Sequence, residues 1–262
     1  MRRIVLRRSL ALVTILIAVS ADISRADVLM TQHGKRVGYP SEKWTRTLRI
    51  KGLRMRVDGT KNGNEFIIIY DLNSGKAYQL YPKHKEAIVV DLKLASATPN
   101  GRLPDEFRRS IKETGNKKDI GGVNCNEYKL DFQVSVAKPR HLGDEVLNTN
   151  GTFCVSQTTP EGVEVANFVQ EAMKRGYGVA TSLLSPTQSS FGSYLFDQEP
   201  NMLVVGSTIE TRIKTTFVQG KSEFMGTATD TLTTSEIKSE SISDEYFQIP
   251  NDWKQKQSTY FR

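Results

Sequence analysis

The chain has 262 residues, with 36 Lys and Arg against 29 Asp and Glu, a net charge of +7, two cysteines and 38% hydrophobic residues. This length fits one large domain or two small ones and buries a core without metal or disulfide support. A charged content of 25% beside that apolar content excludes wholesale disorder. Because the one long apolar run lies at the N-terminus, a multi-span membrane protein is excluded too.

Residues 1–26 have the pattern of a secretory signal peptide. Four arginines precede the apolar stretch Leu10–Val19, which is too short to span a bilayer comfortably. Ser24 and Ala26 then occupy the −3 and −1 positions of a small-residue cleavage site. We therefore expect a secreted, periplasmic protein cleaved after Ala26, with Ala21 as the second choice and an uncleaved membrane anchor as the alternative.

Removing this segment changes the meaning of the charge. It holds five arginines and one aspartate, so residues 27–262 keep 31 basic and 28 acidic residues, a net charge of +3. The basic cluster Arg46–Arg56 alternates with apolar residues at period two, as the solvated face of a strand does. Aromatic residues do not interleave with it as stacking platforms, so we predict no nucleic-acid partner.

Export also bears on the cysteines. Cys125 and Cys154 are the two in the chain, 29 residues apart. An exported protein with two cysteines usually pairs them, and no C-x-x-C redox motif is present. The sequence predicts a structural disulfide.

Turn residues recur every eight to twelve positions through the first third of the chain, which is typical of an antiparallel meander. The predicted strands are Trp44–Lys51, Leu53–Asp58, Phe66–Asp71, Lys76–Tyr81 and Ala87–Asp91, with a turn at Gly59–Asn64. Three consecutive isoleucines in the third of these strands predict a central position that is covered on both faces.

The second half is predicted to hold further strands and one clear helix. Thr159 can cap a helix over Pro160–Arg175, whose apolar residues recur on one face, and Gly176 ends it. The other predictions are a short helix beginning in Pro104–Arg109, a turn-rich stretch at Thr114–Gly122, and strands at Asn126–Val136, Gly151–Ser156, Met202–Gly206, Ile209–Gln219 and 227–243. No linker divides the chain, so we expect a single domain over 27–262.

Motifs that carry chemistry are absent from the sequence. His33, His84 and His141 are isolated from the partners that a zinc site or an acid–base pair needs. No nucleophile elbow and no glycine-rich phosphate loop occurs. The segment Asp71–Gly75 resembles half of a calcium loop, but a hairpin turn explains it better. We predict no enzyme, no metal and no cofactor.

The alternating strands predict a sheet with one apolar face, which a single helix either fills or leaves open as an apolar pocket. Ordinary core packing is the alternative for every residue of that face. The candidate lining residues are Trp44, Leu48, Ile50, Met55, Phe66, Ile68, Tyr78, Leu80, Tyr128, Leu130, Phe132, Phe168, Ile213 and Phe217.

The order of several segments resembles uncharacterised exported bacterial domains near the LolA/LolB/LppX lipoprotein-carrier superfamily. The segments are Lys51–Val57, Ile68–Tyr81 followed by Pro82 and Lys85, Ile120–Tyr128, and Tyr246–Pro250 before Trp253. The resemblance implies an α+β, mainly β fold: a curved antiparallel half-barrel with one or two helices plugging its concave face. It also implies an apolar cavity for acyl chains, and the absence of a lipid-anchor cysteine implies a soluble periplasmic form.

These inferences together predict a non-catalytic periplasmic carrier for a lipid, an acyl chain or another hydrophobic ligand, with transient contact to a membrane surface or an envelope protein. The alternative is a structural or interaction module of the cell envelope whose core is filled by its own helix and loops. The sequence assigns no oligomeric state.

Overall fold

The computed structural model describes residues 27–38, 41–93, 106–137, 144–156, 159–177, 203–216 and 223–259. The strands in these ranges are β1 (Val28–Gly38), β2 (Glu42–Lys51), β3 (Arg54–Lys61), β4 (Asn64–Asp71), β5 (Lys76–Tyr81), β6 (Glu86–Asp91), β7 (Glu106–Ile120), β8 (Val123–Ala137), β9 (Asp144–Ser156), β10 (Leu203–Thr216), β11 (Glu223–Ser239) and β12 (Lys254–Ser258). The helices there are α2 (Pro160–Lys174) and the short 3-10 helices η1 (Pro82–His84) and η2 (Asp244–Phe247).

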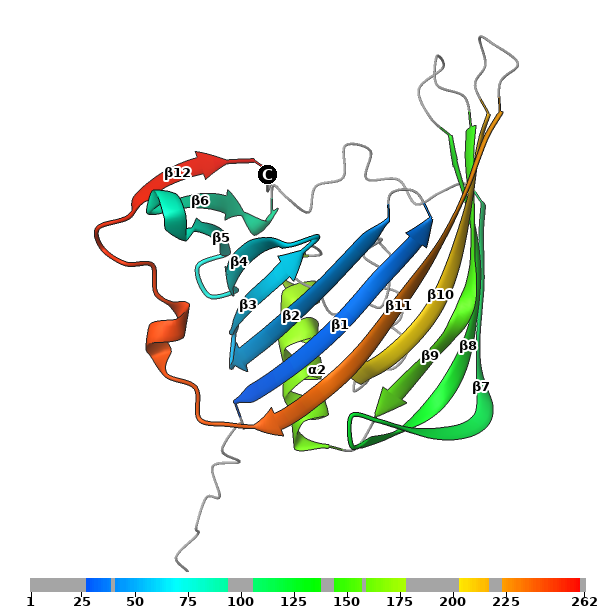
Figure 1. The fold of residues 1–262 in the computed structure, drawn as a ribbon, viewed down its shortest axis with the longest axis horizontal. Coiled ribbons are helices and arrows are strands. Elements are labelled where there is room, and N and C mark those ends of the chain that lie inside the picture. The colour runs from blue at the N-terminus through cyan, green and yellow to red at the C-terminus, as the bar shows by residue number, and fades with distance from the viewer. Residues whose placement is uncertain are drawn as a thin grey trace, which may run out of the picture.

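All these strands belong to one sheet of order β12-β6-β5-β4-β3-β2-β1-β11-β10-β9-β8-β7. The sheet bends strongly, so that β2–β5 on one side and β7–β9 on the other lie around α2 (Figure 1). This confirms the predicted class, a mainly β protein with a curved open sheet. The sheet is mixed rather than wholly antiparallel, because β12 pairs with β6 in parallel.

The predicted meander is confirmed in β2–β6, where turn residues fix the connections. Asn62 and Gly63 have positive φ values of 51° and 83° and form the two-residue turn between β3 and β4. The predicted turn at Gly59–Asn64 was too long, since β3 continues past Gly59 to Lys61. In the next hairpin, Asp71 Oδ1 accepts hydrogen bonds from the backbone N–H groups of Asn73 and Ser74, so these residues form a turn rather than a calcium loop.

Two predictions in the middle of the chain were wrong. Residues 106–109 belong to β7 instead of a helix, because they pair with β8 along the edge of the sheet. The turn-rich stretch is also strand up to Ile120, with the turn itself confined to Gly121 and Gly122. Its turn residues correspond to an irregularity in pairing between Glu113 and Lys117, where Gly115 has a φ of +81°.

Helix α2 forms as its sequence predicts. The Thr159 hydroxyl accepts a hydrogen bond from the Gly162 N–H, Pro160 stands in the first turn, and Gly176 follows the last turn with a φ of +74°. Its buried face, which includes Phe168 and Val169, packs among residues from both sides of the sheet. We call the sheet face that meets α2 the concave face.

Part of the opposite, convex face of β2–β5 is covered by the segment 240–253, which we call the C-terminal strap. Its residues Ile242 and Phe247 pack with Ile69 and Leu80 in a second apolar cluster, separate from the one around α2. The central strand β4 is therefore buried on both faces, as predicted, because Ile68 packs against the first cluster and Ile69 lies in the second.

Basic residues of β2 and β3 hold the strap, which corrects the prediction of a solvated face. Lys51 and Arg54 contact Asp244 at 3.1 and 2.6 Å. Arg56 donates to the carbonyl of Tyr246, and the guanidinium of Arg49 lies 4.7 Å from the centre of the Tyr246 ring. These contacts leave the basic residues only partly exposed.

The predicted disulfide is present. Cys125 of β8 and Cys154 of β9 are bonded, with their Cα atoms 5.5 Å apart, and both are buried. The bond joins two neighbouring antiparallel strands on the side of the sheet away from the strap.

Candidate functional site

The concave face is apolar where it meets α2. Antiparallel register places Met30, Leu48, Val57 and Ile68 in one row across β1–β4. Val28, Ile50, Met55 and Tyr70 form the next row of the same face. All but Ile68 are at most 1% exposed, so these two rows form the floor of the interior.

Above the floor, two aromatic side chains lie flat over glycines of the adjacent strand. A methyl group at Gly34 would stand 2.1 Å from Cζ2 of Trp44, and one at Gly59 would stand 2.5 Å from Cζ of Phe66. Only glycine lets these rings lie so close to the backbone of the neighbouring strand. Trp44 and Phe66 remain half-buried.

A buried cation stands between these aromatic residues on the same face. Arg46 is 4% exposed, and its Nε donates to Oε1 of Gln32 at 2.9 Å. Its guanidinium carbon lies 4.7 Å from the centre of the Trp44 ring. Gln32 in turn donates to Oγ1 of Thr234 at 3.3 Å. Arg46, Gln32 and Thr234 thus form a polar row across the neighbouring strands β2, β1 and β11.

Burial dominates the electrostatics of this row. It lowers the pKa of Arg46 to about 10, because a charged guanidinium loses its hydration there. Burial likewise raises the pKa of the nearby Tyr70 hydroxyl, which is neutral at physiological pH. Within the row of Gln32, Arg46 and Thr234, Arg46 is the one side chain that carries a charge.

The structure divides the fourteen predicted lining residues into three groups. Nine belong to or pack against the cluster around α2: Leu48, Ile50, Met55, Tyr128, Leu130, Phe168, Trp44, Phe66 and Ile68. Tyr78 and Leu80 instead lie on the convex face, in the cluster under the strap. The side chains of Phe132 and Ile213, and all of Phe217, lie outside the described residues.

Sequence reasoning missed the polar members of the interior. Arg46 could have been found, since residues 44, 46, 48 and 50 share a strand face and only one of them is charged. Ser207 of β10 carried no such signal. Its hydroxyl is buried without a hydrogen-bond partner among the described residues, on the side of the sheet away from β2.

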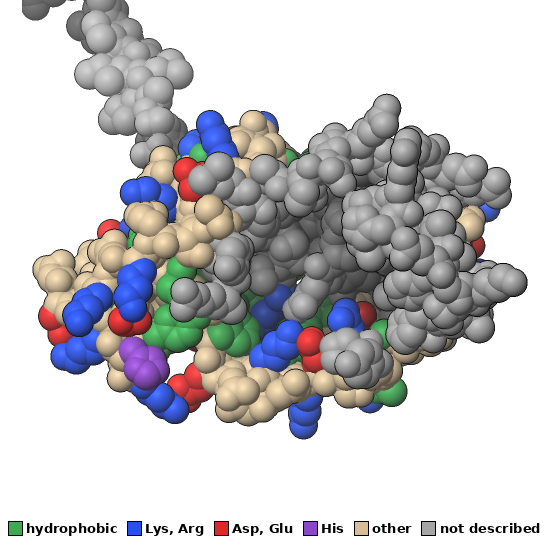
Figure 2. All heavy atoms as spheres, turned by 90° about the horizontal axis from the view of Figure 1, so that it is seen from above, with side chains coloured by type: hydrophobic (Ala, Val, Ile, Leu, Met, Phe, Trp, Pro, Cys, Tyr) green, Lys and Arg blue, Asp and Glu red, His purple; other side chains and the backbone are tan. Residues whose placement is uncertain are grey.

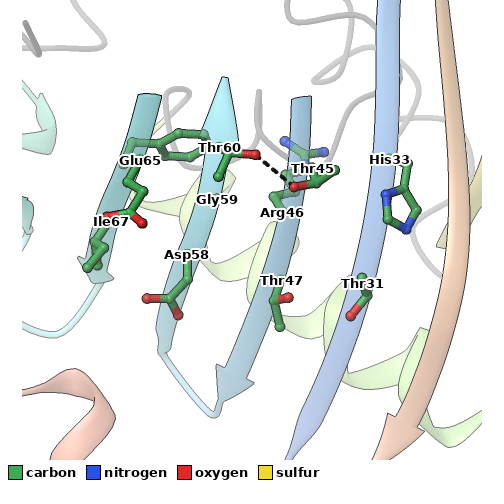
Figure 3. Close-up of a pocket in the computed structure, with 11 residues that line it drawn as sticks. Thr31, His33, Thr45, Arg46, Thr47, Asp58, Gly59, Thr60, Glu65 and Ile67 are labelled. Carbon is green, nitrogen blue, oxygen red and sulfur yellow. Dashed lines mark hydrogen bonds between the residues drawn. The ribbon is translucent and has the colours of Figure 1, made fainter. Parts of the chain in front are cut away.

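Seen from above, hydrophobic side chains gather on one part of the described surface, with basic and acidic side chains beside them (Figure 2). A pocket of about 440 Å³ lies chiefly on the convex face of β1–β4, and Arg46, Gly59 and Phe66 of the concave face also border it. Threonines 31, 45, 47 and 60, together with Asp58, face this pocket, and Arg46 extends to the other side of the sheet (Figure 3). Hydroxyl and carboxylate groups would lose hydration under an apolar ligand, so this pocket does not suit one.

Comparison with known proteins finds similarity among solved structures but none by sequence. No protein-family model matches the chain, and no curated protein matches its sequence. Among solved structures, it is similar to a LolA superfamily protein from Nitrosomonas europaea, at 10% identity and a TM-score of 0.30, over 86% of this chain and 91% of that one.

The described ranges hold neither a metal-binding cluster nor a membrane-spanning helix. They contain no group of three His, Cys, Asp or Glu side chains placed to hold a metal ion. They also contain no helix with the length and apolar character needed to cross a membrane.

Proposed function

We propose that the protein is a non-catalytic carrier that binds a hydrophobic ligand, a lipid or an acyl chain, along its concave face. The observation that carries this proposal is the half-buried apolar surface of Trp44, Phe66 and Ile68, which borders the floor under α2. Apolar surface of this kind on a concave wall favours an apolar ligand, because its burial stabilises the complex by about 25 cal/mol per Å².

The test is binding of a fluorescent acyl probe to purified protein from which lipid has been removed, together with native mass spectrometry of the untreated protein. We expect a bound lipid in the mass spectrum and saturable probe binding. Phe66→Leu should lower the affinity for the acyl probe, since it removes aromatic surface from the concave wall. Tyr78→Leu is the matched control, because it makes a similar change in the cluster under the strap. Absence of both lipid and probe binding would favour the envelope module whose core is filled by its own side chains.

We also propose that the protein acts after export, as a periplasmic domain of residues 27–262 released by cleavage after Ala26. The apolar stretch Leu10–Val19 and the small residues after it support this proposal. The intact mass of the mature chain tests it, and a mass that begins at residue 22 would point to cleavage after Ala21. Loading and delivery of a ligand would then involve transient contact with the membrane surface or with an envelope protein.

A further inference from the structure

Arg46 differs from the other arginines of the described ranges in what it contacts. Every other arginine whose side chain is described has a carboxylate within 4 Å: Arg36, Arg49, Arg54, Arg56 and Arg175. Arg46 is the most buried of the six, and no described carboxylate contacts it. Its neighbours are the neutral side chains of Gln32, Trp44 and Tyr70.

A buried guanidinium normally pairs with an anion, because leaving a charge desolvated and unpaired costs free energy. The single hydrogen bond to Gln32 uses Nε and leaves the two terminal amino groups without a described acceptor. These groups can donate two parallel hydrogen bonds to the oxygens of a carboxylate or a phosphate.

The surroundings also fix the orientation of this side chain. Trp44 stacks against the guanidinium, and the missing side chain of Gly34 is what allows the indole to lie flat at that place. Gln32, held by Thr234, contacts the guanidinium from the next strand. A donor pair held in this way loses little conformational entropy on binding an anion.

We propose that the ligand is an anionic amphiphile whose carboxylate or phosphate head group binds Arg46 while its chain lies along the apolar concave face. This inference rests on the proposed carrier function and names the ligand class. The head group and chain follow from the arrangement of the wall, where Arg46 stands beside the half-buried apolar side chains of Trp44, Phe66 and Ile68.

The experiment compares palmitate, hexadecyl phosphate and hexadecanol, which share a chain of sixteen carbons and differ in the head group. Each is titrated at pH 8 into the lipid-free mature chain as a competitor of the acyl probe. We expect the anionic compounds to bind about 10- to 100-fold more tightly than hexadecanol, the range typical of charge-assisted hydrogen bonds. Whichever of palmitate and hexadecyl phosphate binds more tightly identifies the head group.

Three variants complete the test. Arg46→Met should abolish the preference for anions and leave hexadecanol binding unchanged, whereas Arg46→Lys should keep part of the preference. Lys43→Gln is the matched control and should change nothing, because it removes an exposed positive charge from the convex side of the same strand.

Each contrary outcome is distinguishable. Equal binding of all three compounds to the wild type, or a preference that survives in Arg46→Met, would overturn the role of Arg46 and leave the carrier function standing. Displacement of palmitate by millimolar acetate or inorganic phosphate would show a site for a small free anion. It would overturn the proposal that the ligand is an amphiphile. If no compound binds, the carrier function and this inference both fail.

Discussion

Replacing Arg46 with methionine also tests the energetics of the interior without any ligand. Burial lowers the pKa of Arg46 to about 10, which corresponds to roughly 3 kcal/mol against the charged form in the folded protein. Two contacts oppose this cost. The hydrogen bond to Gln32 is worth about 1.5–3 kcal/mol, and the stacking on Trp44 about 0.5–2 kcal/mol.

Because these terms nearly cancel, we expect Arg46→Met to change the free energy of unfolding of the lipid-free protein by no more than about 1 kcal/mol. Methionine has a similar length and fills the space with apolar atoms. Urea unfolding followed by circular dichroism measures the difference. Arg36→Met is the control, since Arg36 pairs with Asp230 through two hydrogen bonds and its loss should destabilise the protein by about 1–3 kcal/mol.

A loss of about 3–5 kcal/mol in Arg46→Met would refute this reasoning. Losses of that size follow when one partner of a buried ion pair is removed. Such a result would mean that an anion of this chain already neutralises the guanidinium, and a ligand head group would then have no charge to meet.

Three further outcomes follow from the fold. Cys125→Ala with Cys154→Ala should lower the free energy of unfolding by roughly 3–4 kcal/mol, as expected for a closed loop of 29 residues; an unchanged urea midpoint would contradict this. Phe168→Ala should cost about 3–5 kcal/mol in the same assay, because the ring is fully buried in the face of α2. Two basic partners lower the pKa of Asp244, so its ion pairs should hold the strap fully above pH 3.8 and weaken as pH falls through the lowered value, while the apolar contacts of the strap remain. Fluorescence of Trp253 should report that loosening, and in Asp244→Asn the acid step should disappear.

Local signals in the sequence were sufficient for the elements that turns and caps define. The hairpins β2–β6 and the helix α2 follow from residues such as Asn62, Gly63 and Thr159, whose side chains or positive φ values act within a few positions. The edge strand β7 was missed because its turn residues mark a pairing irregularity rather than a loop. Strand β1 was missed because the face that carries Val28 and Met30 continues with Gln32 and Gly34, which interrupts the apolar alternation.

The candidate site was predictable only in part, for a reason of register. Tyr78 and Leu80 alternate as clearly as Leu48 and Ile50 do, but turn lengths decide which face each strand presents to α2. The strap then buries the convex face of β5. Apolar alternation in β5 therefore marks the cluster under the strap and not the cluster around α2. The polar row around Arg46 depends on contacts between strands, which single-strand patterns do not show.

The open sheet leaves two terminal strands, β12 and β7, with backbone groups that could add a strand from another molecule. Both carry exposed charges along their length, among them Lys254 and Lys256 on β12 and Lys112, Lys117 and Lys118 on β7. Exposed charged side chains on an edge strand must lose hydration when a second molecule pairs with that edge, so they oppose such pairing. The curvature that wraps the sheet around α2 therefore comes with edges whose charge opposes strand addition and aggregation.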